Sequence, residues 1–313
     1  MRESFLVTHV IVCRALVVAV LTATAATVAA AQITPGSAAD WSAVEQALGR
    51  KGAMQPGDAM RFSFPRRDLR VTARGVELRP AFALGSWVAF KRVGGGHAMV
   101  MGDLVLTEDE VNGVISRLQE GGVQQTALHN HVLGESPRIM YLHIDAHADP
   151  ASIARTIRKA LEATATPLDT ATGPAVASAL ELDTAQITRT LGHAGRVNGG
   201  VYQLSIPRAE RITEGGREVP ASMGLGTVIN FQPTGSGRAA ITGDFVMTAR
   251  EVNPVIRALR ENGIEITALH SHMLGEQPRL FFMHFWGNDD ALKLARGLRA
   301  ALDVTNSRRA PDR

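Results

Sequence analysis

Alternating and helical patterns of apolar residues occur in the same order in both halves of the chain. Residues 60–64 and 202–206 alternate with period two, which predicts strands with one buried face. Residues 111–118 and 252–259 carry apolar side chains three and four positions apart, which predicts amphipathic helices. The pattern therefore predicts one structural unit that occurs twice.

Helix starts are marked by residues that satisfy free backbone groups. The pairs Thr107/Glu110 and Thr248/Glu251 form capping boxes. A last helix is expected from Asp149–Pro150, with an equivalent in the second half. Each half then reads as helix, four strands, helix, two strands and helix. This predicts an α+β fold of two homologous copies, each a largely antiparallel sheet packed with helices.

Self-comparison divides the chain into segments. Phe90 matches Phe231 and His129 matches His270, and the match extends over domain-sized units. The expected segments are a signal peptide over 1–31, a first α+β repeat over 40–163, an Ala-, Thr- and Pro-rich linker over 164–183, a second repeat over 184–304, and a disordered tail over 305–313.

The first segment has the pattern of a secretory signal peptide. Arg2 and Arg14 precede or open an apolar, Ala-rich run, and Ala29 and Ala31 suit cleavage before Gln32. An uncleaved membrane anchor is the alternative, but the apolar run is short for a membrane span. The protein is therefore expected to be periplasmic or secreted, without stable membrane insertion after cleavage.

Composition narrows the possible chemistry. The only cysteine, Cys13, lies in the expected signal peptide, which excludes disulfides, thiolate ligands and a cysteine nucleophile from the mature chain. The net charge is +3 and no basic run indicates nucleic-acid binding. No phosphate loop, dinucleotide fingerprint or Ser-His-Asp order is visible in the sequence.

The strongest chemical signal is the motif HxHxxxExxRxxxxH, which occurs in both halves. Residues 126–144 and 267–285 are identical at eleven of nineteen positions, including every His, the Glu and the Arg, whereas several apolar positions differ. Packing tolerates volume-conserving exchanges, so the retained imidazoles favour chemistry over packing. Six of the ten histidines lie in the motifs: His129, His131, His143, His270, His272 and His284.

Each motif predicts a β-hairpin that gathers imidazoles. His129 and His131 share one strand face, and closure over residues 133–138 would place His143 roughly opposite His129. Glu135 lies at the turn, within reach of the imidazoles. Such donors suit a divalent transition metal, with Zn²⁺ preferred. The predicted metal ligands are His129, His131, Glu135, His143, His270, His272, Glu276 and His284.

Two residue types in the motif are candidates for catalysis. Glu135 and Glu276 are candidate general bases beside a metal-bound water. Arg138 and Arg279 are candidates to hold an anionic group or to pin the neighbouring glutamate. Surface ion pairing explains the two arginines equally well.

Several alternatives stay open at the level of sequence. The motifs also suit a structural polar network, or a metal-free site for an envelope glycan or another anionic ligand. They could build two separate sites or one composite site. Asp103 and Asp244, on the strand before each capped helix, fit a turn or edge role better than a role in orienting a histidine.

The runs TALHNHVLGESPRIMYLHI and GDLVLTEDEV, with their repeats, resemble the LppY/LpqO family of secreted bacterial proteins over nearly all of the mature chain. The resemblance implies an envelope location and no activity, since that family is a domain of unknown function. HNHVLGE is also similar to the first cupin motif, but capped helices between the strands argue against a nearly all-β cupin. A metallo-β-lactamase match lacks the Asp-His that should follow the His pair.

These observations predict a periplasmic metal-binding protein with duplicated hairpin sites, and a metal-dependent hydrolase is one form of that function. The alternative is a metal-free binding module for an envelope glycan or anionic ligand. The expected partner is a small molecule or an envelope component.

Overall fold

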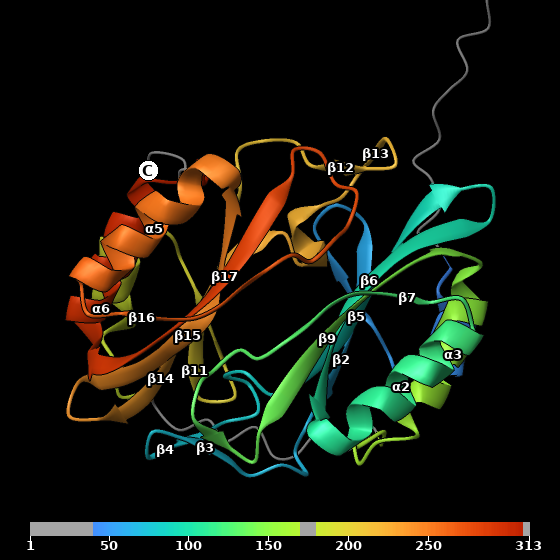
Figure 1. The fold of residues 1–313 in the computed structure, drawn as a ribbon, viewed down its shortest axis with the longest axis horizontal. Helices are drawn as coiled ribbons and strands as arrows, with labels where there is room; N and C mark the ends of the chain where they lie inside the picture. Colours follow the sequence, from blue (N-terminus) through green and yellow to red (C-terminus); the bar gives the residue numbers. More distant parts are fainter. Residues whose placement is uncertain (1–39, 170–179, 309–313) are drawn as a thin grey trace, which may run out of the picture. The chain divides into compact units, whose positions relative to one another are not determined.

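The computed structural model describes residues 40–169 and 180–308, which belong to one unit (Figure 1). Its framework is a pair of six-stranded antiparallel sheets, one from each half. The strand orders are β1-β2-β5-β6-β9-β7 and β10-β11-β14-β15-β17-β16, so the two halves share one topology. This confirms the duplicated α+β fold.

The bounds of the main elements follow chain order. The first sheet contains β1 (Ala53–Gln55), β2 (Ala59–Pro65), β5 (Gly85–Gly94), β6 (His97–Thr107), β7 (Gln124–His129) and β9 (Ile139–Ala148). The second contains β10 (Arg196–Asn198), β11 (Val201–Pro207), β14 (Gly226–Gly235), β15 (Arg238–Thr248), β16 (Glu265–His270) and β17 (Leu280–Asp290). The helices are α1 (Ser42–Leu48), α2 (Glu108–Glu120), α3 (Pro150–Leu161), α4 (Thr184–Leu191), α5 (Ala249–Glu261) and α6 (Ala291–Asp303).

Short elements complete the two halves. They are β3 (Val71–Ala73), β4 (Val76–Leu78), β8 (Glu135–Ser136), β12 (Thr213–Glu214), β13 (Arg217–Glu218) and the 3-10 turn η1 (Ala221–Met223). The predicted count of six strands per half is too low, because the described residues form nine strands in the first half (β1–β9) and eight in the second (β10–β17). β1, β8 and β10 are among the strands missed, and strands of two or three residues are too short to show a period of two.

The predicted helix starts are confirmed. The Glu110 carboxylate accepts the Thr107 backbone N–H at 2.9 Å, and Glu251 accepts that of Thr248 at 2.7 Å. The Asp149 side chain accepts the Ser152 N–H at 2.8 Å at the start of α3. Each contact satisfies a backbone N–H at a helix start.

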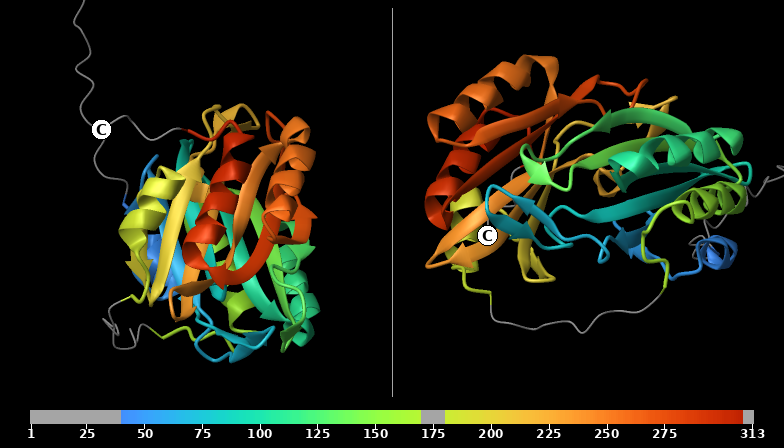
Figure 2. Two further views of the ribbon diagram at one scale, coloured as in Figure 1. Left: turned by 90° about the vertical axis from the view of Figure 1, so that its left-hand side faces the viewer. Right: turned by 60° about the horizontal axis from the view of Figure 1, so that its bottom comes forward.

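Helices cover one face of each sheet and leave the other face to the opposite half. Figure 2, left, looks onto the layer of α4, α6 and α5 in yellow, red and orange. Their apolar side chains pack on Phe231, Phe245 and Phe285 of the second sheet. On the other side, Tyr141 and Trp286 belong to one buried cluster that draws on both halves. The two sheets therefore meet through faces that carry no helix.

Some expectations fall partly or wholly outside the described residues. The signal peptide lies outside them, as do the middle of the linker and the end of the tail. Residues 305–308, which the sequence assigns to the tail, contact the second half: Asn306 N donates to Glu251 at 2.7 Å and Arg308 N to Pro207 O at 2.8 Å. Among the described residues, no helix has the length and apolar character that a membrane span requires.

Candidate metal centre

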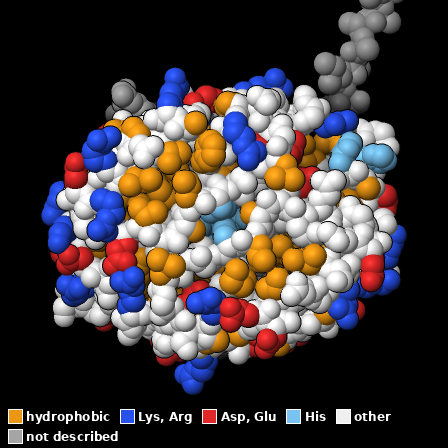
Figure 3. Space-filling model, in the orientation of Figure 1, with side chains coloured by type: hydrophobic (Ala, Val, Ile, Leu, Met, Phe, Trp, Pro, Cys, Tyr) orange, Lys and Arg blue, Asp and Glu red, His pale blue; other side chains and the backbone are white. Residues whose placement is uncertain are grey.

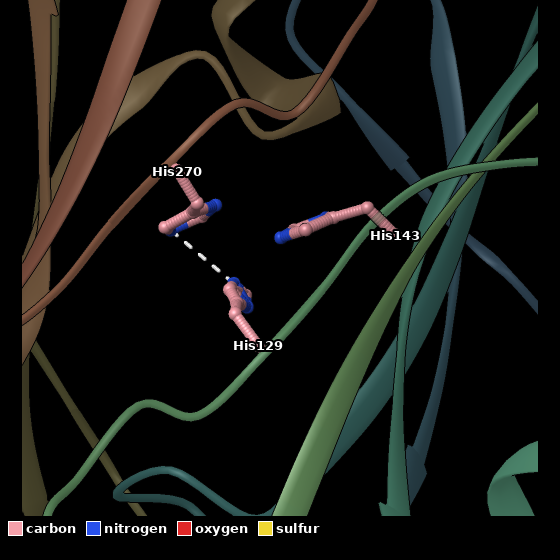
Figure 4. A group of neighbouring side chains, drawn as sticks. All are labelled: His129, His143 and His270. Carbon is pink, nitrogen blue, oxygen red and sulfur yellow. Dashed lines mark hydrogen bonds between the residues drawn. The ribbon is translucent and has the colours of Figure 1, made fainter.

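The histidines of both motifs converge in one place between the two sheets. Figure 4 shows His129, His143 and His270 with their rings directed into a common space from ribbons of both halves. His129 and His270 end the edge strands β7 and β16, and His143 and His284 lie in the neighbouring strands β9 and β17. The histidines of the two motifs therefore form one cluster instead of two separate ones.

The closest approach of the two halves in this site is between imidazoles. His129 Nε2 lies 3.2 Å from His270 Nε2. Two nitrogens bound to one tetrahedral Zn²⁺ at ordinary bond lengths are separated by about 3.3 Å. The observed separation therefore suits two ligands of the same ion.

Three groups of side chains have ligand atoms that all lie within 4.8 Å of one another. They share members, so a single cluster contains all of them. The groups are His129, His143 and His270; His129, His131 and His284; and Asp244, His270 and His284.

Strand register explains how the sheets present these side chains. Asp103 of β6 lies directly opposite His143 of β9, and Asp244 of β15 opposite His284 of β17. Directly opposite residues share one face of a sheet, so each carboxylate stands beside an imidazole. Asp103 and Asp244 are only 7% and 8% exposed, in central strands. The turn or edge role expected for them is therefore wrong.

The predicted pairing within the hairpin is also wrong. His129 lies opposite Tyr141, and His143 lies opposite Ala127. A bulge between Gln125 and Ala127 interrupts the β7–β9 pairing. A bulge shifts the register in a way that residue spacing does not reveal. His129 and His143 still share a face, with ring centres 4.9 Å apart.

Two of the imidazoles each contact a backbone carbonyl oxygen through one ring nitrogen. His284 Nδ1 donates to Gly243 O at 2.7 Å, and His272 Nδ1 lies 3.1 Å from Gly224 O. Because His284 donates through Nδ1, its Nε2 is free as a ligand, which is the usual arrangement around bound metals. Within the described structure, the buried Nε2 atoms of His143 and His284 have no hydrogen-bond partner. Buried nitrogens with a free lone pair directed into the cluster could serve as ligands of a metal ion.

The two carboxylates differ in how closely they approach the imidazoles. Asp244 Oδ2 lies 2.9 Å from His272 Nε2, whereas Asp103 Oδ2 lies 3.7 Å from His131 Nε2. Burial raises the pKa of Asp103 to about 7. Burial also acts to raise the pKa of Asp244. His284 and His272 act in the opposite direction and outweigh burial, so the pKa of Asp244 lies below its usual value.

Burial lowers the pKa of five of the six clustered imidazoles. Burial, followed by the neighbouring His284, lowers the pKa of His129 to about 3. Burial and adjacent histidines likewise lower the pKa of His131, His143 and His270. Neutral imidazole is the form that binds metals, so the site is prepared for a cation.

The predicted glutamates lie in the turns and brace the backbone there. Glu135 Oε1 accepts the Ile139 N–H at 3.2 Å, and Glu276 Oε1 accepts the Leu280 N–H at 2.8 Å. Neither belongs to the three close groups of donors. Glu276 Oε2 also accepts from Arg279 at 3.0 Å. Glu135 Oε2 is buried and unpartnered in the described structure, and burial raises the pKa of Glu135 to about 7.

The predicted arginines lie at the surface. Arg138 is exposed and lies 3.6 Å from Glu108, and the Arg279 guanidinium pairs with Glu276 and donates to Met273 O at 2.9 Å. Arg279 therefore contacts Glu276, whereas Glu135 has no ion pair with an arginine among the described residues.

Reciprocal contacts between the halves hold the loops that carry His131 and His272. Thr126 Oγ1 donates to His272 O, and Thr267 Oγ1 donates to His131 O, each at 2.6 Å. Both threonines are identical positions of the motif, but their partners belong to the other half. Comparison of the two repeats shows that both threonines are retained, but it cannot show that each threonine contacts the opposite half.

Comparison with known proteins gives a family and little else. No curated protein matches the chain. Among solved structures, a trimeric bacterial microcompartment shell protein, PduB, is 16% identical, with 81% of this chain and 89% of that chain covered and a TM-score of 0.22. EtuB from Clostridium kluyveri is 11% identical, with 80% and 88% covered and a TM-score of 0.20. Scores this low carry no conclusion about this chain.

The family comparison covers both halves. One family model matches twice, over residues 42–163 and 185–304, which contain all six clustered histidines. The chain belongs to the family described as Domain of Unknown Function (DUF1259).

Proposed function

We propose that this protein binds a divalent transition metal ion, with Zn²⁺ as the leading candidate, in one centre shared by its two halves. The observation that carries the proposal is the 3.2 Å approach of His129 Nε2 to His270 Nε2 within a cluster of imidazoles from both halves. Nitrogen donors with carboxylates suit Zn²⁺, and other divalent transition metals share this preference. Glu135 and Glu276 have structural contacts instead of places in the cluster, so the proposed ligands are histidines with Asp244.

The proposed location is the bacterial envelope. The signal-peptide pattern and the resemblance to the LppY/LpqO family support export to the periplasm or beyond. The proposed ligand is then a small molecule or envelope component, and a metal-free glycan or anion site remains the alternative function.

A metal-dependent hydrolase is the second candidate. Each group of three donors leaves one position of a tetrahedral ion for water or substrate. His131 and His270 are half-buried, and Figure 3 shows histidine side chains at the surface near the middle of this face. Glu135 is the better base of the two glutamates, because one of its carboxylate oxygens has no partner within the described structure.

Elemental analysis of the exported, untagged protein tests the proposal. We expect about one metal ion per chain, as one tetrahedral centre requires. The double variant His129→Ala/His270→Ala should lose the ion and keep its circular dichroism spectrum. His97→Ala/His147→Ala is the matched control, because these histidines are exposed neighbours on β6 and β9 with ring centres 5.3 Å apart. Absence of metal from the wild type, with no uptake on titration, would refute a metal centre.

A further inference from the structure

Arg61 lies on the histidine-bearing face of the first sheet, and it forms no ion pair with a carboxylate of the described residues. Register places Ser63 opposite Trp87 and Trp87 opposite Asp103, in the row that continues to His143. Residues directly opposite share a face, and Arg61 is on the face of Ser63 because it is two residues away. The Arg61 guanidinium carbon lies 3.9 Å from the centre of the Trp87 ring. The guanidinium is therefore held flat on a tryptophan in the histidine-bearing face.

The hydrogen-bonding capacity of this guanidinium is largely unused. In the described part of the chain, its one recorded hydrogen bond is from Nη1 to Ser222 O, at 3.2 Å. A guanidinium has five N–H donors. Among the described residues, the two fully buried arginines each pair with two carboxylates, whereas Arg61 is half-buried: Arg66 pairs with Asp68 and Glu110, and Arg208 with Glu210 and Glu251.

The local charges leave the Arg61 side of the centre positive. Burial lowers the pKa of Arg61 to about 10, which still leaves it protonated at neutral pH, and Asp103 acts in the opposite direction. Arg196 of β10 is a second positive charge, and its repulsion also lowers the pKa of Arg61. Asp103 approaches His131 instead, at 3.7 Å. A half-buried cation without a bonded counter-ion is partly desolvated, and an anionic ligand would supply the missing charge partner.

This arrangement occurs in the first half alone. β2 and β11 align at their final prolines, so Gln203 occupies the position of Arg61, and it donates to Ala81 O at 2.7 Å. Val228, opposite Ser205, occupies the position of Trp87. The histidines are duplicated and this Arg–Trp pair is not. A ligand at the proposed metal centre would therefore meet different side chains on the side of the first half and on the side of the second half.

We propose that Arg61 binds an oxyanion, a carboxylate or phosphate group, of the ligand that reaches the metal centre. Its planar fork suits two oxygens of such a group, and Trp87 holds the fork in place. The role beside a metal rests on the proposed function, whereas the binding of the anion by Arg61 does not.

Titration with inorganic phosphate, and separately with acetate, tests this role in chelator-treated and Zn²⁺-loaded protein. Calorimetry gives the affinity, and Trp87 fluorescence reports contact at this position. We expect at least one of the two anions to bind, and Arg61→Gln to weaken that binding about tenfold or more, which corresponds to loss of about 1.4 kcal/mol. Arg61→Lys keeps the charge and stem but not the fork, and should bind more weakly than wild type. Arg92→Gln is the control, because Arg92 also lies over a tryptophan, Trp41, at 4.7 Å.

The outcomes separate the two proposals. Arg61-dependent binding of either anion in protein that takes up no metal would support the anion site and refute the metal centre. Stoichiometric metal without Arg61-dependent binding of either anion would refute the anion site alone. Equal loss in Arg61→Gln and Arg92→Gln would also refute it. If Arg61→Gln does not fold, unchanged affinity in Arg61→Lys decides against the proposal.

Discussion

At the scale of single residues, the contact made by one ring nitrogen of an imidazole determines whether the other ring nitrogen is free to bind a metal. His284 Nδ1 donates to Gly243 O, which leaves Nε2 directed into the cluster. Asp244 stands beside His272 and His284, and its pKa lies below the usual value. A carboxylate in this position both orients an imidazole and supplies negative charge to a bound cation.

Asp244→Asn should therefore weaken Zn²⁺ binding about 10- to 100-fold, as is typical for groups that orient metal ligands. Competition with a chromogenic chelator measures the change. Asp289→Asn is a suitable control, because Asp289 pairs with Lys293 at the helix start of α6, outside the cluster. An unchanged affinity in Asp244→Asn would show that this carboxylate has no part in the site.

At the scale of elements, a buried arginine ties the start of each capped helix to its sheet. Arg208 donates to Val246 O at 2.7 Å and pairs with Glu251, which also caps α5. Arg66 makes the same contacts with Val105 and Glu110 at α2. Glu251 therefore links helix, strand and arginine in one network.

Glu251→Gln should destabilise the fold by about 3 kcal/mol at pH 7, since it breaks a buried ion pair. Burial acts to raise the pKa of Glu251, but hydrogen bonds from Arg208 and Thr248 outweigh it and leave the pKa below 4.5. A lowered pKa stabilises the fold above pH 4.5 and ceases to do so as pH falls through the folded value. Urea unfolding at pH 7 and pH 3.5 should show a smaller difference between variant and wild type at the lower pH. Exposed Glu261→Gln should have little effect at either pH.

At the scale of the whole molecule, the centre belongs to both halves equally. His129 comes from the first sheet and His270 from the second, and threonines of each half hold the loop of the other. A ligand that binds only the folded chain stabilises it in proportion to its excess over the dissociation constant. Metal should therefore stabilise the two halves together.

Zn²⁺ at a hundredfold excess over its dissociation constant should add about 2.7 kcal/mol and raise the melting temperature by several degrees. His129→Ala and His270→Ala should abolish this shift to a similar extent, although they lie in different halves. Differential scanning calorimetry measures it, with His97→Ala as the control. A shift that persists in either single variant would indicate two independent sites.

Local patterns in the sequence were sufficient for the repeated elements and the identity of the candidate donors. Capping boxes and apolar spacing predicted α2 and α5, because a helix start and an amphipathic face depend on residues a few positions apart. Comparison of the two motifs singled out the six histidines, because drift at neighbouring apolar positions made the retained imidazoles conspicuous.

Only the tertiary structure decided which donors meet. The bulge after Gln125 changed the partner of His129, and register across four strands brought Asp103 and Arg61 toward the histidines. Glu135 and Glu276 brace their turns, although spacing alone made them equal candidates with the histidines. Spacing along a chain constrains contacts within one hairpin. The approach of His129 to His270 depends on how the two sheets pack against each other, and no local pattern encodes that.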